Sequence, residues 1–138
     1  MDYPLDAVIF DMDGLLVDSE PLWRRAEQAV FPKVGVQLTD AMCMQTMGTR
    51  VDEVVQHWYN QKPWTGPTLQ AVETEIVDAV VDLVRTEGAP LPGVRQVLEL
   101  FAGQGVPIAL ASSSSARLID AVVDTLAVSY THLTLPTN

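Results

Sequence analysis

Residues 7–20 read AVIFDMDGLLVDSE, and this stretch decides the fold that we expect. Its first four residues form an apolar run of the length that is typical of a buried strand. Asp11 and Asp13 then stand where that strand ends and a turn containing Gly14 begins. Because ligands of open α/β sheets bind at the carboxyl ends of the strands, these two carboxylates are candidate site residues.

The spacing of Asp11 and Asp13 points to their chemistry. Side chains two residues apart on an extended chain lie on the same side, so both carboxylates can share one site. Two carboxyl groups at such a short distance resist ionising together unless a cation or a proton lies between them. This arrangement suits phosphoryl transfer assisted by Mg²⁺. The alternative is that the acids and Gly14 only make a turn, but the polar residues 18–20 that follow favour the functional interpretation.

Composition limits the possible partners. A chain of 138 residues ordinarily forms one domain, and 48% hydrophobic with 19% charged residues is typical of a globular protein. The net charge of −10, with only two lysines, leaves no basic stripe for a phosphate backbone, so we expect no nucleic-acid and no membrane partner. No apolar stretch reaches the roughly 20 residues that span a bilayer.

The single cysteine, Cys43, excludes an intramolecular disulfide and fits a reducing compartment. Residues 1–6 carry acids where a signal peptide has basic residues. We therefore expect a cytoplasmic protein.

The periodicity of apolar residues outlines the rest of the chain. Helical spacing extends from residue 15 to residue 87, with Thr39 and Thr49 as predicted N-caps, and a proline-rich loop at residues 63–67. A further helix over 94–103, a strand over 106–111 and a helix from 116 to 126 follow. This order predicts an α/β protein, a partial doubly wound (Rossmann-like) core with an inserted all-helical cap.

Four serines, residues 112–115, lie between the second predicted strand and the last helix. Backbone N–H groups at a helix N-terminus bind anions, and the hydroxyl groups add donors. A plain helix cap or linker explains the same residues equally well.

Residues 7 to about 126 resemble the first part of a capped phosphatase of the haloacid dehalogenase superfamily, and within it the bacterial hexitol phosphatase/2-deoxyglucose-6-phosphate phosphatase group. The superfamily resemblance is carried by residues 11–16. Leu110-Ala111-Ser112 matches the second signature of the superfamily. The narrower resemblance is carried by the cap and linker strings Glu20-Pro21-Leu22-Trp23, Pro63-Trp64-Thr65-Gly66-Pro67 and Leu91-Pro92-Gly93-Val94-Arg95.

The resemblance implies roles for the core residues. Asp11 is then the nucleophile that forms an aspartyl-phosphate, and Asp13 protonates the leaving oxygen and later activates water. Mg²⁺ would bind to the Asp11 carboxylate and the Asp13 backbone carbonyl. Ser112 would hold the phosphoryl group, with Ser113 beside it. An acid at Asp13 favours a phosphoryl substrate over a haloacid.

The resemblance also implies substrate contacts from the cap. Trp23 would stack on a sugar, Arg50 would bind hydroxyl or phosphate oxygens, and Glu20 is a weaker candidate of the same kind. Core packing explains Trp23 as well, and Arg50 can equally be a surface residue at its helix start.

By the same resemblance, residues 1–16 form the first strand and nucleophile loop, 17–88 the helical cap, and 89–127 the second, incomplete part of the core. Residues 128–138 carry no Asp, Glu, Lys or Arg and do not resemble the family's continuation, so we interpret them as a non-native tail, with a genuine short strand as the alternative. The family also needs a downstream lysine and further metal-binding acids, yet no lysine follows Lys62 and the last acid is Asp124. We expect a truncated product with little activity alone.

The predicted function is a Mg²⁺-dependent phosphatase that hydrolyses small sugar phosphates of the hexose or hexitol 6-phosphate type through an aspartyl-phosphate. Two alternatives stay open: a sugar phosphomutase of the β-phosphoglucomutase type, and a non-catalytic scaffold or interaction protein. The expected partner is a small sugar phosphate, and the sequence does not fix the oligomeric state.

Overall fold

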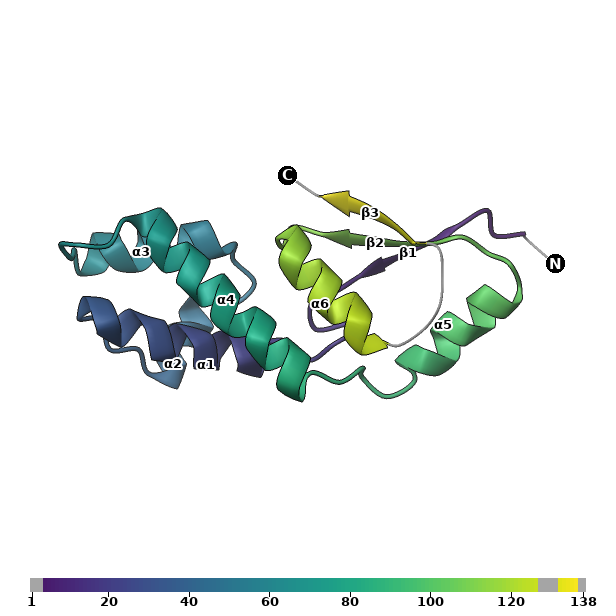
Figure 1. The fold of residues 1–138 in the computed structure, drawn as a ribbon, viewed down its shortest axis with the longest axis horizontal. Helices are drawn as coiled ribbons and strands as arrows, with labels where there is room; N and C mark the ends of the chain where they lie inside the picture. Colours follow the sequence, from purple (N-terminus) through teal and green to yellow (C-terminus); the bar gives the residue numbers. More distant parts are fainter. Residues whose placement is uncertain (1–3, 127–131, 137–138) are drawn as a thin grey trace.

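The computed structural model describes residues 4–126 and 132–136 (Figure 1). A first strand, a run of helices and then a return to alternating strands and helices follow one another, in the order that the sequence predicts. The elements are β1 (Val8–Asp11), α1 (Glu20–Val30), the 3₁₀ helix η1 (Phe31–Val34), α2 (Asp40–Gln45), α3 (Val51–Gln61), α4 (Leu69–Glu87), α5 (Val94–Gly103), β2 (Ile108–Ser112), α6 (Ala116–Leu126) and β3 (His132–Pro136).

The strands form one parallel sheet in the order β1-β2-β3. Asp11 pairs in register with Ala111, so the ends of β1 and β2 reach the same edge of the sheet. The backbone of residues 132–136 forms β3, which is the strand alternative that the sequence left open for the tail. Residues 127–131 and 137–138 lie outside the described residues, and the non-native origin of the tail stays a prediction.

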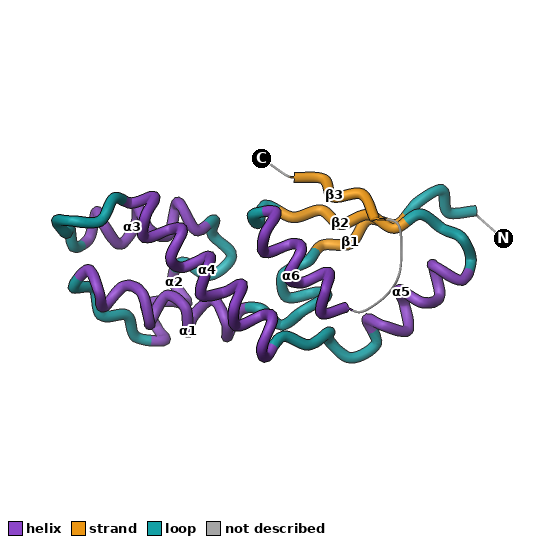
Figure 2. Tube along the Cα trace, in the orientation of Figure 1, coloured by secondary structure: helices purple, strands orange, loops and turns teal. Residues whose placement is uncertain are grey.

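Helices α1–α4 gather at one end of the molecule, and the sheet with α5 and α6 lies at the other (Figure 2). The two groups are joined by neighbouring backbone segments, since the Leu91 N–H donates to the Leu16 carbonyl at 2.9 Å and Val17 bridges to Pro90. Helix α4 also packs on α6. This arrangement supports our proposal that the helical cap begins at residue 17 and ends at residue 88.

Local chemistry explains most helix boundaries. Thr39 caps α2 by accepting the Met42 N–H at 3.2 Å, as predicted. The predicted cap at Thr49 is wrong, because α3 begins one residue later with Arg50 in the N-cap position. Within the described residues Arg50 makes no side-chain cap bond; two acids in the first turn of α3 favour the helix start through the helix dipole instead.

The second strand begins at Ile108, two residues later than predicted. Pro107 has no N–H to give to a sheet, and its carbonyl accepts the Val8 N–H at 2.9 Å just before the paired segment.

The core runs without interruption from the sheet into the helical group. Met12 is fully buried, whereas its neighbours Asp11 and Asp13 are exposed. The buried Met12 side chain therefore anchors the loop after β1 and leaves both acids on its open side. Among the described residues, no helix combines the length and apolar character that crossing a membrane requires.

Candidate active site

Asp11 and Asp13 lie where β1 ends, as the sequence predicts. The Asp11 Oδ1 atom accepts the Met12 N–H at 2.7 Å, which fixes the carboxylate against its own loop. Gly14 has a φ of 73°, and its N–H donates to the Val17 carbonyl at 3.0 Å. A side chain at Gly14 would strain this left-handed conformation, so the glycine is needed for the turn from Asp13 to Val17.

The Asp13 carboxylate is held from two directions. The Ser19 hydroxyl donates to Oδ1 at 2.7 Å, and the Ser114 hydroxyl donates to Oδ2 at 3.2 Å. Ser19 precedes α1 and is only 1% exposed, and Ser114 comes from the loop between β2 and α6. Asp13 is thus tied to the start of the helical cap and to the second strand at once. Hydroxyl groups both donate and accept, so they can orient this carboxyl in either protonation state.

The serine loop lies beside the two acids because Ala111 pairs with Asp11. Ser112 is 5% exposed, and its Oγ atom accepts the Ser114 N–H at 3.1 Å. Ser115 caps α6 through the Leu118 N–H at 3.4 Å. Ser113 is exposed at the site. The role of Ser112 as the phosphate hydroxyl stays a prediction.

A cavity of about 710 Å³ opens between this edge of the sheet and helices α1–α4. Its volume falls in the range of small-molecule sites. It is lined by six of the seven residues singled out from the sequence: Asp11, Asp13, Glu20, Trp23, Arg50 and Ser113. Ser112 is the seventh, and it lies directly before the lining residues 113–115.

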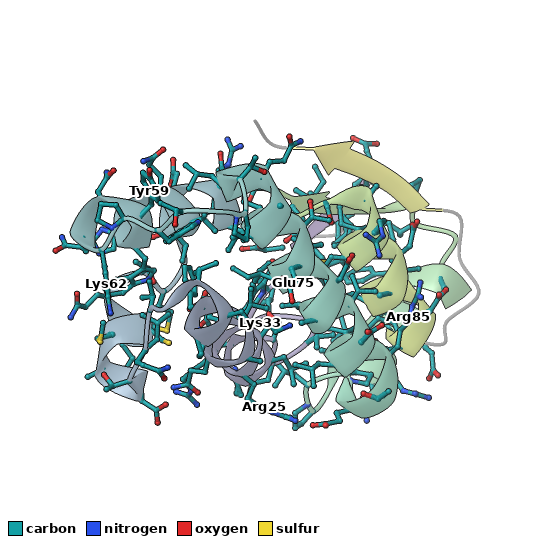
Figure 3. The ribbon with its side chains drawn as sticks, turned by 60° about the vertical axis from the view of Figure 1, so that its left-hand side comes forward. Arg25, Lys33, Tyr59, Lys62, Glu75 and Arg85 are labelled. Carbon is teal, nitrogen blue, oxygen red and sulfur yellow. The ribbon has the colours of Figure 1, made fainter. Side chains whose placement is uncertain are left out.

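The two lysines are engaged elsewhere. Lys33 pairs with Glu75 of α4, as Figure 3 shows, and the Lys62 Nζ donates to the Gly35 carbonyl at 2.7 Å. Neither of them lines the cavity. The described residues therefore bring no lysine to the candidate site.

Acids dominate the electrostatics of the cavity. Both of its arginines already face an acid: Arg50 lies 3.2 Å from Asp52, and the Arg24 Nε atom lies 3.8 Å from Asp40. The acids that line the cavity are Asp11, Asp13, Asp18, Glu20, Glu27, Asp52 and Glu73. Burial, and next the charge of Asp13, raises the pKa of Glu20 above its ordinary value.

Glu27 is a buried acid of the cavity lining that sequence analysis did not single out. It is 7% exposed, on the side of α1 that also carries Glu20 and Trp23. Burial raises the pKa of the Glu27 carboxyl from its ordinary 4.5 to about 7; the adjacent Cys43 thiol opposes this rise and the charge of Glu20 adds to it. Burial, and next the charge of Glu27, raises the pKa of the Cys43 thiol to about 12, which keeps the thiol protonated at neutral pH.

The raised pKa of Glu27 makes stability depend on pH. The contribution of Glu27 to stability is complete below about pH 4.5, where its carboxyl is protonated in both the folded and the unfolded protein. This contribution is lost as the pH rises through about 7. Between about pH 4.5 and about pH 7, we expect the free energy of unfolding of the wild type to fall by about 3 kcal/mol more than that of Glu27→Gln. Urea unfolding of both proteins at about pH 5 and about pH 8 measures the difference. An identical pH dependence of the two proteins would contradict this electrostatic account of Glu27.

The site offers oxygen ligands for a metal. Carboxylate and carbonyl oxygens suit Mg²⁺, and among the described residues no hydrogen bond occupies the Asp13 backbone carbonyl. Asp11 uses one carboxylate oxygen for the Met12 N–H. Residues 4–126 and 132–136 contain no cluster of three His, Cys, Asp or Glu side chains that could enclose a metal ion. A partial, two-residue oxygen site is therefore what the described chain provides.

The family model described as "Hydrolase: haloacid dehalogenase-like hydrolase" matches residues 5–132. The chain belongs to the haloacid dehalogenase-like hydrolases. Hexitol phosphatase B of Escherichia coli K12 is 42% identical over 118 residues, which cover 85% of this chain and 53% of that protein. This hydrolase chain thus spans about half the length of the curated relatives that it matches.

Solved structures share the fold of this chain. CbbY from Rhodobacter sphaeroides, in complex with phosphate, superposes with a TM-score of 0.80 at 21% identity, over 88% of this chain and 57% of that one. A putative β-phosphoglucomutase from Thermotoga maritima gives a TM-score of 0.72 at 25% identity, over 94% of this chain and 61% of that one. The Rossmann-like α/β class predicted from the sequence is confirmed.

Proposed function

We propose that this hydrolase releases phosphate from small sugar phosphates of the hexose or hexitol 6-phosphate type. One observation carries the proposal: Asp11 and Asp13 face a cavity of about 710 Å³, with Asp13 held by hydroxyl groups from two separate elements. The identity to hexitol phosphatase B supports the choice of substrate.

The first half of the reaction forms an aspartyl-phosphate. A carboxylate oxygen of Asp11 attacks phosphorus, and the bond between phosphorus and the sugar oxygen breaks. Asp13 in its protonated form gives its proton to that oxygen, so the sugar leaves as a neutral alcohol. Ser19 and Ser114 hold the Asp13 carboxyl in position while it gives up the proton.

The second half returns the protein to its starting state. Asp13, now ionised, takes a proton from a water molecule as the water oxygen attacks phosphorus. The bond between phosphorus and Asp11 breaks, phosphate leaves, and Asp13 is protonated again. The serine at position 113 would donate to phosphate oxygens from its exposed place at the site, and Ser112 is proposed to do so from the same loop.

We propose that Mg²⁺ is the cofactor, held by the Asp11 carboxylate and the Asp13 backbone carbonyl. When bound, it would neutralise charge between the nucleophile and the phosphate. On the cap side, Trp23 is proposed to pack against the sugar, and Arg50 and Glu20 to contact its oxygens, since all three line the cavity. A cytoplasmic location stays a prediction.

The second candidate is a sugar phosphomutase, favoured by the structural likeness to the putative β-phosphoglucomutase. It would use the same Asp11 and Asp13 but return the phosphoryl group to the sugar. The assay described next separates both functions from a non-catalytic scaffold.

The assay follows phosphate release from a hexitol 6-phosphate, and isomerisation of β-glucose 1-phosphate, by the protein expressed from its complete reading frame with Mg²⁺. We expect phosphate release from the hexitol phosphate and no isomerised sugar phosphate. Isomerisation without phosphate release would show the mutase, and turnover of neither substrate would favour the scaffold. An otherwise identical assay with EDTA should abolish release if the proposed metal is needed.

A further inference from the structure

Glu27 has a buried carboxyl that faces the cavity without a strong donor. It is 7% exposed and lines the cavity from α1. Among the described residues, none of the nitrogen or oxygen donors makes a hydrogen bond to it, and its neighbour is the Cys43 thiol, a weak donor. The Cys43 thiol is the hydrogen-bond partner of this carboxyl. A thiol is a weak donor and a carboxylate can accept several hydrogen bonds, so a ligand that brings a hydroxyl donor stabilises the buried group further.

The position of Glu27 fits the remote end of a substrate. Glu20, at the start of α1, lies next to the loop of Asp13, because Ser19 contacts both the helix start and that carboxylate. Seven residues separate Glu20 from Glu27, which is about 10 Å along the helix axis and brings both side chains to similar faces. A substrate whose phosphate lies at Asp11 therefore reaches Glu27 with its far end.

The charge of the cavity selects the kind of group that can lie there. Seven acids line it, and its two arginines face acids of their own. A second phosphate or a carboxylate at the far end would meet like charge without a free cation, whereas a neutral hydroxyl can donate to a carboxylate.

We propose that Glu27 is a specificity-determining residue that binds hydroxyl groups at the end of the substrate remote from the phosphate. The substrate class is then a phosphate monoester of a neutral, hydroxyl-rich sugar or polyol, and sugar bisphosphates are rejected. This inference rests on the proposed function for the place of the phosphate.

Calorimetric titration of the full protein in EDTA, where we expect no hydrolysis, tests the inference by binding alone. The probes are sorbitol 6-phosphate, inorganic phosphate and a hexose 1,6-bisphosphate. We expect Glu27→Leu to weaken binding of sorbitol 6-phosphate by about tenfold to a hundredfold, the loss of one hydrogen bond to a charged group, and to leave binding of inorganic phosphate unchanged. Glu99→Gln, an exposed charge removed from α5, is the matched control and should change neither.

Glu27→Gln is the second variant, in case the leucine disturbs folding. Glutamine keeps an acceptor but removes the charge. We therefore expect Glu27→Gln to bind sorbitol 6-phosphate more tightly than Glu27→Leu does, and to bind the hexose 1,6-bisphosphate more tightly than the wild type does. The inference is overturned if Glu27→Leu binds sorbitol 6-phosphate as tightly as the wild type does, or if its affinity for inorganic phosphate falls by the same factor. It is also overturned if the wild type binds sorbitol 6-phosphate and the hexose 1,6-bisphosphate with equal affinity. Failure of the proposed function shows separately, as turnover that survives Asp11→Asn.

Discussion

Asp11→Asn is expected to lower phosphate release from hexitol 6-phosphates by at least about a thousandfold, the scale on which loss of a covalent nucleophile acts. The amide has the shape of the carboxylate but cannot attack phosphorus. It can still accept the Met12 N–H through its oxygen, so the loop after β1 should keep its conformation. Steady-state phosphate release measures the effect.

The control for Asp11→Asn is Asp6→Asn, which removes the same charge from an exposed residue ahead of β1. We expect that variant to retain wild-type turnover, and both variants to retain the melting temperature. Wild-type turnover in Asp11→Asn would remove Asp11 as the nucleophile.

Asp13→Asn is expected to slow hydrolysis of sugar phosphates by about a hundredfold to ten-thousandfold, the usual contribution of a general acid or base. The sugar oxygen is a poor leaving group without a proton, and water is a poor nucleophile without a base. Both halves of the reaction therefore slow, although the amide can still accept from Ser19 or Ser114.

A second substrate separates the two roles of Asp13. The nitrophenolate of p-nitrophenyl phosphate leaves without protonation, so Asp13→Asn should still form the aspartyl-phosphate and then fail to hydrolyse it. Stopped-flow absorbance should show a burst of nitrophenolate followed by a slow steady state. Equal losses on both substrates without a burst would argue that Asp13 acts by position alone.

Sequence patterns predicted the fold well because periodicity and breakers are local. The apolar run before Asp11 gave β1, and Gly88 marked the end of α4. The errors concern where an element begins. Thr49 is a good cap residue, but after the turn through Gly48, which has a φ of 79°, Arg50 takes the N-cap position of α3. Likewise, Pro107 delays β2 because it cannot donate to the sheet.

The candidate site was predicted as a set of residues but not as a set of contacts. Register alone brings Ser114 to Asp13, across 101 positions of the chain, and no local pattern encodes that pairing. Ser19 precedes a helix as a cap residue would, yet its hydroxyl serves Asp13. Glu27 was missed because an acid among the apolar positions of α1 resembles a surface residue; its spacing of seven from Glu20 was the available signal.

Trapping the phosphorylated protein tests directly whether Asp11 carries the phosphoryl group. The protein expressed from its complete reading frame is mixed with a hexitol 6-phosphate and Mg²⁺, quenched in acid, digested and analysed by mass spectrometry. We expect one added phosphoryl group on the peptide that contains Asp11, and none in Asp11→Asn. A phosphoryl group on another residue of a wild-type protein that releases phosphate would contradict the role of Asp11 as the nucleophile. A phosphoryl group that is still added to Asp11→Asn would contradict it as well.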